Sequence, residues 1–340
     1  MEKKLINISY IKVIIMLVIV LYHSMLFFNG EWFVYQTPIF KADYLKYIAN
    51  WLNTFHVQTF CMVSGFLFYY LKIEKGRYNN PIKDIKKRSK RLLIPYIFTS
   101  VFWVIPIAIY FNNYSALDII KKFVLMESPN QLWFLIMLFL VFVFFELFSN
   151  KIRISFKNLF IIFILSTGLG FTLQLFDINY FQISKAVQYI IYFYLGGYIY
   201  KNKDKTSIKQ IVLMLLMFIL LYGICLYFNY LDIFVLNCLS KFILTIVSIC
   251  EVSIIYYIIT KAVEKKKLKT NNIIYKLVDE NNFGIYLFHQ QIIYFMIVLL
   301  NGVVHPIIQV IASFVVALII SILMTVILRK NKVTKTMFGV

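Results

Sequence analysis

Two side chains near the start of the chain have types and spacing suited to acting on one substrate. Lys12 and His23 are eleven residues apart in a single apolar stretch. In a helix this spacing is close to three turns, so both side chains lie on one face, about 16 Å apart along the axis. Histidine can move a proton or carry a transferred group, and lysine can bind an anion. The alternative is that Lys12 extends to the interface with water and His23 is a hydrogen-bonded core residue.

Other polar residues stand out because they interrupt apolar stretches. His56, in the second stretch, is expected at a depth similar to that of His23, so the two histidines could pair or line one cavity. His289, Gln290 and Gln291 follow one another in a later stretch, and Glu251 is the one acid well inside a stretch. Polar groups at such positions are costly in a bilayer and are often functional. A buried acid beside a histidine could orient it or exchange a proton with it, or could make a structural contact.

A pair of arginines marks another candidate site. Arg88 and Arg91 are three residues apart in a strongly basic run, so they share a face if a helix begins there. The planar guanidinium group suits bidentate binding of phosphate. The alternative is that the run only sets the orientation of the chain in a membrane.

The composition indicates which elements must position these residues. Of the 340 residues, 61% are hydrophobic and 19% aromatic, and the mean hydropathy is +0.78. A soluble domain of this length could not bury so much apolar surface, so we expect an all-α membrane protein that forms one domain over residues 1–340. A span needs about 20 mostly apolar residues. About ten are predicted, near residues 6–28, 47–71, 91–112, 132–149, 157–176, 184–200, 209–229, 236–260, 281–300 and 306–328.

The distribution of charge sets the predicted topology. The chain has 35 Lys and Arg against 15 Asp and Glu, a net charge of +20. The basic residues gather in alternate connections, above all in 72–91, which holds nine of them. Basic loops stay in the cytoplasm, so both termini are predicted to be cytoplasmic. This arrangement explains the positive charge without nucleic acid, and it also provides a basic surface for an anionic ligand.

Several familiar kinds of site are missing from the sequence. We find no Gly-x-Ser-x-Gly, phosphate-binding loop or dinucleotide-binding motif, and no His or Cys spacing typical of a metal site. No metal is therefore expected. The four cysteines lie in or beside apolar segments, and no pair of them suggests a disulfide.

A resemblance to a known family rests on six segments in order. Lys12-x10-His23 resembles the Arg/Lys-x10-His motif of the acyltransferase-3 family of membrane proteins, and Arg88-Ser89-Lys90-Arg91 resembles its Arg-x-x-Arg motif. The other four segments, which add Ser64 and Trp133 to the candidates, are Phe60–Leu67, Leu132–Leu135, Tyr192–Gly197 and Tyr286–Gln290. One departure is that the first helix of the family usually begins with an acidic residue before an arginine, whereas here Asn7 to Ile11 precede Lys12.

The resemblance implies an O-acetyltransferase of the bacterial cytoplasmic membrane. The donor would be cytoplasmic acyl-CoA, with acetyl-CoA expected and succinyl-CoA as the alternative. The acceptor would be a hydroxyl of a surface polysaccharide or lipid-linked glycan. His23 would be the catalytic residue, with His56, His289 or Glu251 as partners. Lys12, Arg88 and Arg91 would bind the donor, and Ser64, Trp133 and Gln290 are candidates for the substrate site. A polysaccharide exporter and a non-enzymatic subunit of an envelope assembly system remain alternatives.

Overall fold

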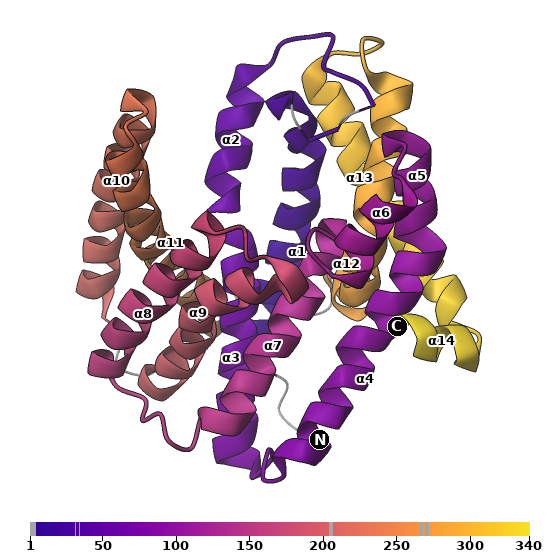
Figure 1. Cartoon of the computed structure of the whole chain (residues 1–340). Coiled ribbons are helices and arrows are strands. Elements are labelled where there is room, and N and C mark those ends of the chain that lie inside the picture. Colours follow the sequence, from indigo (N-terminus) through magenta and orange to yellow (C-terminus); the bar gives the residue numbers. More distant parts are fainter. Residues whose placement is uncertain (1–4, 31, 34, 204–206, 266–267, 269–271) are drawn as a thin grey trace.

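The computed structural model is helical throughout most of the residues that it describes, which are 5–30, 32–33, 35–203, 207–265, 268 and 272–340 (Figure 1). Parts of two other basic connections, 201–209 and 261–276, which the sequence also predicts to be cytoplasmic, fall outside these ranges. In chain order the helices are α1 (Ile6–Leu26), α2 (Asp43–Asn53), α3 (His56–Lys75), α4 (Pro81–Thr99), α5 (Ile105–Asn112), α6 (Ala116–Ile119), α7 (Trp133–Phe148), α8 (Phe156–Leu175), α9 (Ile183–Asn202), α10 (Ile208–Leu231), α11 (Phe234–Glu264), α12 (Ile273–Leu300), α13 (Pro306–Arg329) and α14 (Lys332–Phe338).

Eight helical segments of the described chain are long and apolar enough to cross a bilayer. They are Ile6–Asn29, Pro81–Asn112, Asn130–Phe148, Phe156–Leu175, Ile208–Leu231, Phe234–Glu264, Ile273–Leu300 and Pro306–Arg329. The prediction of an all-α membrane protein is thereby confirmed, since the described ranges contain helices and no strand. α3 and α9 are about as long as several of these eight segments, but they are less apolar and are not among them. The count of ten spans therefore stays a prediction for these two helices.

The predicted helix over 47–71 is broken, which corrects the sequence-based expectation. α2 ends at Asn53 and α3 begins at His56, because Phe55 leaves the helical conformation with φ −135° and ψ −21°. The hydroxyl of Thr54 lies 2.7 Å from the carbonyl oxygen of Trp51 and 2.6 Å from a carboxylate oxygen of Glu251, so its one hydrogen is shared between two acceptors. Such a local side-chain bond competes with the helical ladder, which explains the break. As a result His56 stands at the first turn of α3.

The basic run lies inside a helix that begins ten residues before the predicted start. The side chain of Asn80 caps the backbone N–H of Lys83 at 3.1 Å, and Pro81 occupies the first helical position, where proline costs no hydrogen bond. α4 then continues through a π-helical turn, Ser100–Val104, into α5. Arg88 and Arg91 therefore share a face of a regular helix.

α3 and α9 pack backbone against backbone. A β-carbon on Gly65 would come within 1.9 Å of the carbonyl oxygen of Phe193, and one on Gly196 within 2.1 Å of that of Met62. Small residues allow such close approach between membrane helices. This contact holds the polar α3 inside the bundle.

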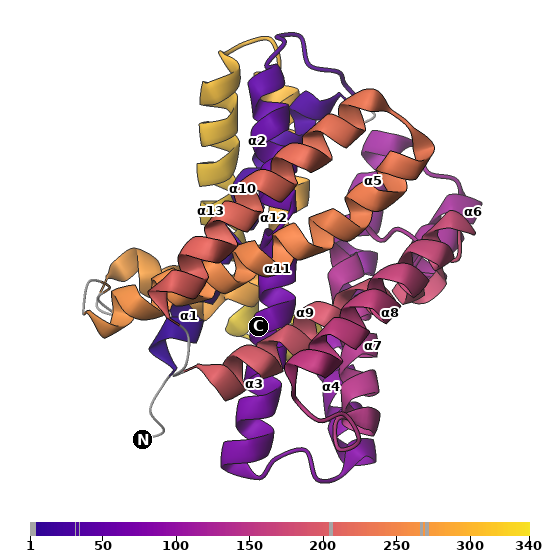
Figure 2. The same cartoon turned by 90° about the vertical axis from the view of Figure 1, so that its left-hand side faces the viewer.

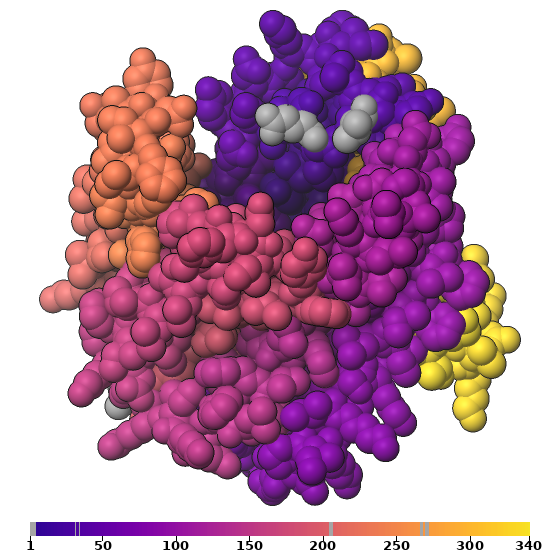
Figure 3. All heavy atoms as spheres, viewed as in Figure 1, coloured from indigo at the N-terminus to yellow at the C-terminus, as the bar shows by residue number. Residues whose placement is uncertain are grey.

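The helices differ in how deeply they lie. In the most apolar stretches of α1 and α12, 61% and 67% of the residues are buried, and these two helices pack against each other. In α10 only 11% is buried, and α10 packs mainly against α11. The α10–α11 pair crosses the outside of α1–α3 (Figure 2), and the surface is hollowed between this pair and α2 (Figure 3). The candidate residues on α1, α3 and α12 thus lie in the core of the bundle.

Candidate active site

One cavity of about 1330 Å³ runs through the bundle between α1, α3, α4, α7 and α12. Residues from the predicted cytoplasmic side, including Arg77, Lys83 and Arg88, line it at one end. Residues that follow α1 and α5, including Asn29 and Tyr114, line the other end. Nine of the ten candidate residues line this single cavity: Lys12, His23, His56, Ser64, Arg88, Arg91, Trp133, His289 and Gln290.

His23 and His289 are in contact inside the cavity. Nδ1 of His23 lies 3.3 Å from Nε2 of His289, and the ring centroids are 4.9 Å apart. The two residues come from α1 and α12, which are 266 residues apart in sequence. The helix periodicity places His23 beside Lys12, but only the packing of α12 on α1 places His289 beside His23.

Backbone carbonyls determine which nitrogen of each ring carries the proton. Nδ1 of His289 lies 2.8 Å from the carbonyl oxygen of Ile285 and 3.0 Å from that of Tyr286. Both are acceptors, so this Nδ1 carries the hydrogen and, in the neutral ring, Nε2 accepts. Nδ1 of His23, which lies 2.9 Å from the carbonyl oxygen of Ile19, then donates to both that carbonyl and His289.

The same contacts leave a basic nitrogen on His23. Because its Nδ1 carries the hydrogen, the lone pair of the neutral ring is on Nε2. This Nε2 has no hydrogen-bond partner among the described residues, and His23 is only partly buried and lines the cavity. An oriented imidazole with an available Nε2 is the arrangement required of a general base.

His56 provides a second oriented imidazole. Its Nδ1 donates to the carbonyl of Leu52 at 2.7 Å, across the break between α2 and α3. Its ring lies 4.4 Å from that of Tyr22, the residue before His23, and both rings line the cavity. The break therefore places a histidine at the first turn of α3, close to the His23–His289 pair.

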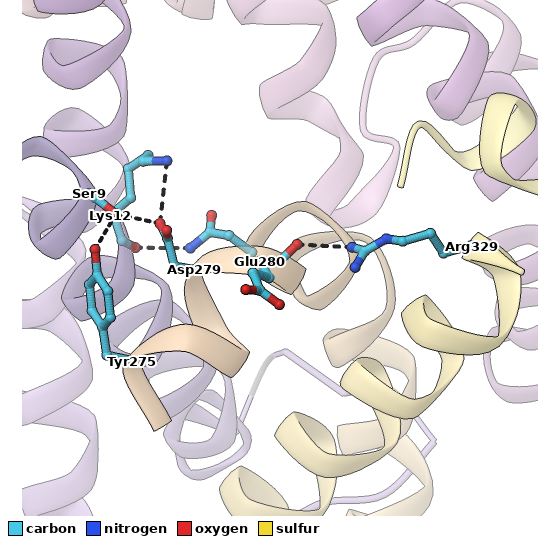
Figure 4. A network of polar contacts seen from close by, with 7 residues as sticks. Ser9, Lys12, Tyr275, Asp279, Glu280 and Arg329 are labelled. Atoms are coloured by element: carbon cyan, nitrogen blue, oxygen red, sulfur yellow. Dashed lines mark hydrogen bonds and ion pairs between the residues drawn. The ribbon is translucent and has the colours of Figure 1, made fainter. Parts of the chain in front are cut away.

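Lys12 belongs to a polar network that joins α1 to α12 (Figure 4). Its Nζ lies 3.7 Å from Oδ1 of Asp279, which also accepts from the hydroxyl of Ser9 at 2.5 Å. The hydroxyl of Tyr275 donates to Ser9 at 2.8 Å. Lys12 thus has an acidic partner from α12, although no acidic residue precedes it in α1. Sequence reasoning missed Asp279, because nothing local connects it with a residue 267 positions earlier.

A second polar contact anchors the other side of α12. The side chain of Arg329 donates to the carbonyl of Glu280 at 2.9 Å (Figure 4). The amide of Asn282 donates to the carbonyl of Lys12 at 3.1 Å. Residues at the beginning of α12 are therefore held from both α1 and α13, which fixes Asp279 relative to Lys12.

The basic end of the cavity is arranged around Arg88. Its guanidinium lies 4.0 Å from the ring centroid of Phe142 and donates to the hydroxyl of Tyr78. Arg91, one turn further along α4, is exposed and also lines the cavity. Arg77, Lys83 and Lys87 add positive charge to this end, and they were not singled out in the sequence. This concentration of cations suits an anionic group such as phosphate.

The remaining candidates have different surroundings. Ser64 donates to the carbonyl of Phe60 at 3.0 Å, and the amide of Gln290 donates to the hydroxyl of Tyr294 at 2.6 Å. Trp133 lies at the start of α7, where Gln131 bonds to Gln291 of α12 at 2.7 Å. Gln131 also lines the cavity, and its role in joining α7 to α12 was not apparent from the sequence.

Glu251 is the candidate that the structure does not bring to His23. Its two carboxylate oxygens accept from the indole N–H of Trp51 at 2.9 Å and from the hydroxyl of Thr54 at 2.6 Å. It does not line the cavity. Its carboxylate stabilises the break between α2 and α3, so the structure supports the structural alternative for this residue.

Metal ligands do not gather in the described part of the chain, since no three His, Cys, Asp or Glu residues there are placed to hold an ion. The four cysteines, all described, are free.

These features describe a polytopic membrane protein with an internal cavity that is basic at one end and lined by histidines further in. The family model for an acyltransferase domain, Acyl_transf_3, matches residues 5–326, nearly the whole length, so the chain belongs to the acyltransferase-3 family. It is therefore a membrane acyltransferase by family. No curated protein and no solved structure matches it.

Proposed function

We propose that this protein transfers an acetyl group from acetyl-CoA to a hydroxyl of a cell-surface carbohydrate, in the cytoplasmic membrane of a bacterium. The observation that carries the proposal is the single cavity that contains both the basic rim at Arg88 and the oriented His23. An acyltransferase needs a place for an anionic donor and a base near the acceptor. This cavity offers both within one space.

The basic end supports a CoA thioester as the donor. CoA carries phosphates on its nucleotide, and Arg88 and Arg91 present guanidinium groups suited to phosphate. Lys12 also lines the cavity, on the same helix as His23. The distance of about 16 Å along α1 between Lys12 and His23 is comparable with an extended pantetheine arm. The charge and the shape of the cavity thus fit this donor.

The chemistry assigned to His23 is general-base catalysis. Nε2 of His23 accepts the proton of the acceptor hydroxyl while the hydroxyl oxygen forms a bond to the acyl carbon. The carbon–sulfur bond then breaks, and His23 returns the proton to the departing thiolate, which yields an ester and a free thiol. The Nδ1–H of His23 stays on Ile19 and His289, which keeps the ring oriented throughout. General-base catalysis of this kind contributes about 10²–10⁴-fold.

The proposal is tested by expressing the wild type and His23→Ala in a strain that lacks this protein. Ester-linked acetyl and succinyl groups on the purified surface polysaccharide are then quantified by NMR. We expect the wild type to add an O-acetyl signal and His23→Ala to add none at equal membrane levels. A succinyl signal instead of the acetyl signal would identify succinyl-CoA as the donor. Unchanged acylation with less exported polymer would overturn the enzyme proposal in favour of an exporter.

A further inference from the structure

A second, smaller cavity lies on the side of the bundle, between the α10–α11 pair and α2, α3 and α9. Its volume is about 340 Å³, and Figure 3 shows the surface hollowed between α10–α11 and α2. We refer to it as the lateral groove. Its lining residues are Asn50, Asn53, Thr54, Gln58, Tyr192, Tyr222, Cys225, Leu226, Asn229, Leu244, Thr245 and Ser248.

The lining of the lateral groove is polar and carries no charged side chain. Four carboxamides and three aliphatic hydroxyls face it, together with two tyrosines. Carboxamides can donate and accept hydrogen bonds, and tyrosine adds an aromatic face. The main cavity differs because arginines and lysines gather at its basic end. The groove therefore suits a neutral ligand rich in hydroxyl groups and does not suit a phosphate.

Gln58, which lines the lateral groove, has one buried acceptor without a hydrogen-bond donor among the described residues. The amide nitrogen of Gln58 donates to the carbonyl of Asn53 at 3.2 Å. Its Oε1 is buried and has no partner among the described residues. An unpaired buried acceptor costs about 1–3 kcal/mol, so Gln58 keeps one acceptor that no described residue satisfies.

The lateral groove adjoins the main cavity at the break between α2 and α3. Asn53 lines both the groove and the main cavity. Three residues later, His56 lines the main cavity. Thr54 lines the groove and is fixed by Glu251 and by Ser248, which donates to its backbone carbonyl at 2.5 Å. The break thus lies between the two spaces, and Asn53 stands at the edge that they share.

We propose that the lateral groove binds a neutral sugar segment of the acceptor and directs a hydroxyl of that segment past Asn53 toward His23. The inference rests on the proposed function for the identity of the reaction, and it adds the position and the chemistry of the acceptor site. The donor and the acceptor then approach His23 by separate routes, one basic and one uncharged.

Steady-state kinetics test the acceptor site with purified protein, acetyl-CoA and oligosaccharides released from the surface polysaccharide of the strain that carries it. Gln58→Leu and Asn229→Leu should each raise KM for the oligosaccharide about fivefold to tenfold, as expected for one lost hydrogen bond. KM for acetyl-CoA should stay within twofold. Gln174→Leu, on an exposed part of α8 outside the groove, should match the wild type. An unchanged oligosaccharide KM in folded Gln58→Leu and Asn229→Leu would overturn the proposal.

Photo-cross-linking tests the same site without relying on acyl transfer or on those variants. A benzophenone amino acid replaces Leu226, which lines the groove, or Leu220, which is exposed on the same helix outside it. After irradiation in membranes of the same strain, we expect a carbohydrate-positive adduct from position 226 and none from 220. No adduct at 226, or equal adducts at both positions, would overturn the acceptor site. If wild-type protein transfers no acyl group but the adduct forms, the proposed function fails and the sugar site stands.

Discussion

Nε2 of His289 accepts a hydrogen bond from Nδ1 of His23 at 3.3 Å, and His289 is itself fixed by the carbonyl of Ile285 at 2.8 Å. These hydrogen bonds connect the backbone carbonyl of Ile285 through two imidazole rings to the cavity. In the proposed reaction, Nε2 of His23 is left free to act as the base. His289 is then expected to be a positioning residue for His23.

His289→Leu tests this arrangement. Loss of the acceptor should lower kcat about 10–100-fold with little change in either KM, because the tautomer of His23 is then held by Ile19 alone. His23→Ala should lower kcat about 10²–10⁴-fold. In the double variant the effects should not add, since His289 acts through His23. Additive losses in acetyl-transfer assays would show that His289 acts independently.

Arg88 and Arg91 are expected to differ from neighbouring basic residues. Arg88→Lys keeps the charge but loses the planar contact with Phe142 and bidentate binding, so KM for acetyl-CoA should rise about tenfold while kcat changes little. Lys90→Met, which removes an exposed lysine outside the cavity, is the matched control and should behave as wild type. A rise in KM for acetyl-CoA in Lys90→Met, with no change in Arg88→Lys, would mean that only the overall charge matters.

The Lys12–Asp279 pair should contribute more to stability than an ion pair on the surface. The Asp279 side chain is 9% exposed and that of Lys12 is 33% exposed. Asp279→Asn should lower the free energy of unfolding by about 1–3 kcal/mol, between the values typical of exposed and buried pairs. The control is Glu264→Gln, in the exposed pair with Lys261 at 2.6 Å, where less than about 1 kcal/mol is expected. Unfolding in detergent, with equal losses for both, would contradict this ranking.

Glu251→Gln separates a structural role from a catalytic one. The variant keeps the shape of the side chain but weakens the bonds from Trp51 and Thr54, since bonds to a carboxylate are stronger than bonds to an amide. Its melting temperature should fall, and kcat of the folded fraction should stay within about twofold of the wild type, because removal of a catalytic acid or base costs about 100-fold or more. A large fall in kcat at an unchanged melting temperature would return Glu251 to the catalytic residues.

Gly196→Ala tests the backbone contact of α3 with α9. The added carbon meets Met62 and Phe66 backbone atoms at 2.1 and 2.5 Å, so the helices must separate, at a cost of about 1–3 kcal/mol. Gly223→Ala in α10 is the control, because a β-carbon there has nothing within 4 Å. It should leave stability unchanged or raise it by up to about 1 kcal/mol. The melting temperature and the yield of monodisperse protein measure both.

The sequence by itself determined the class of fold and most of the candidate site. In a bilayer, a long apolar stretch can pair its own backbone N–H and C=O groups only by forming a helix. Lys12 and His23 share a face of such a helix because of the helical period. Arg88 and Arg91 are three residues apart in one helix, so the sequence also predicted that they share a face. These are local properties, set by residues close together in the chain.

Tertiary structure decided which distant residues meet. Asp279 reaches Lys12 and His289 reaches His23 only because α12 packs along α1. The helix predicted over 47–71 is broken at Thr54, whose hydroxyl is bonded to Glu251. The same bond holds Glu251 at the break, outside the cavity. The lateral groove likewise exists only through the placement of α10 and α11 against α2. Packing between helices depends on the shapes of surfaces far apart in sequence, and no local period encodes it.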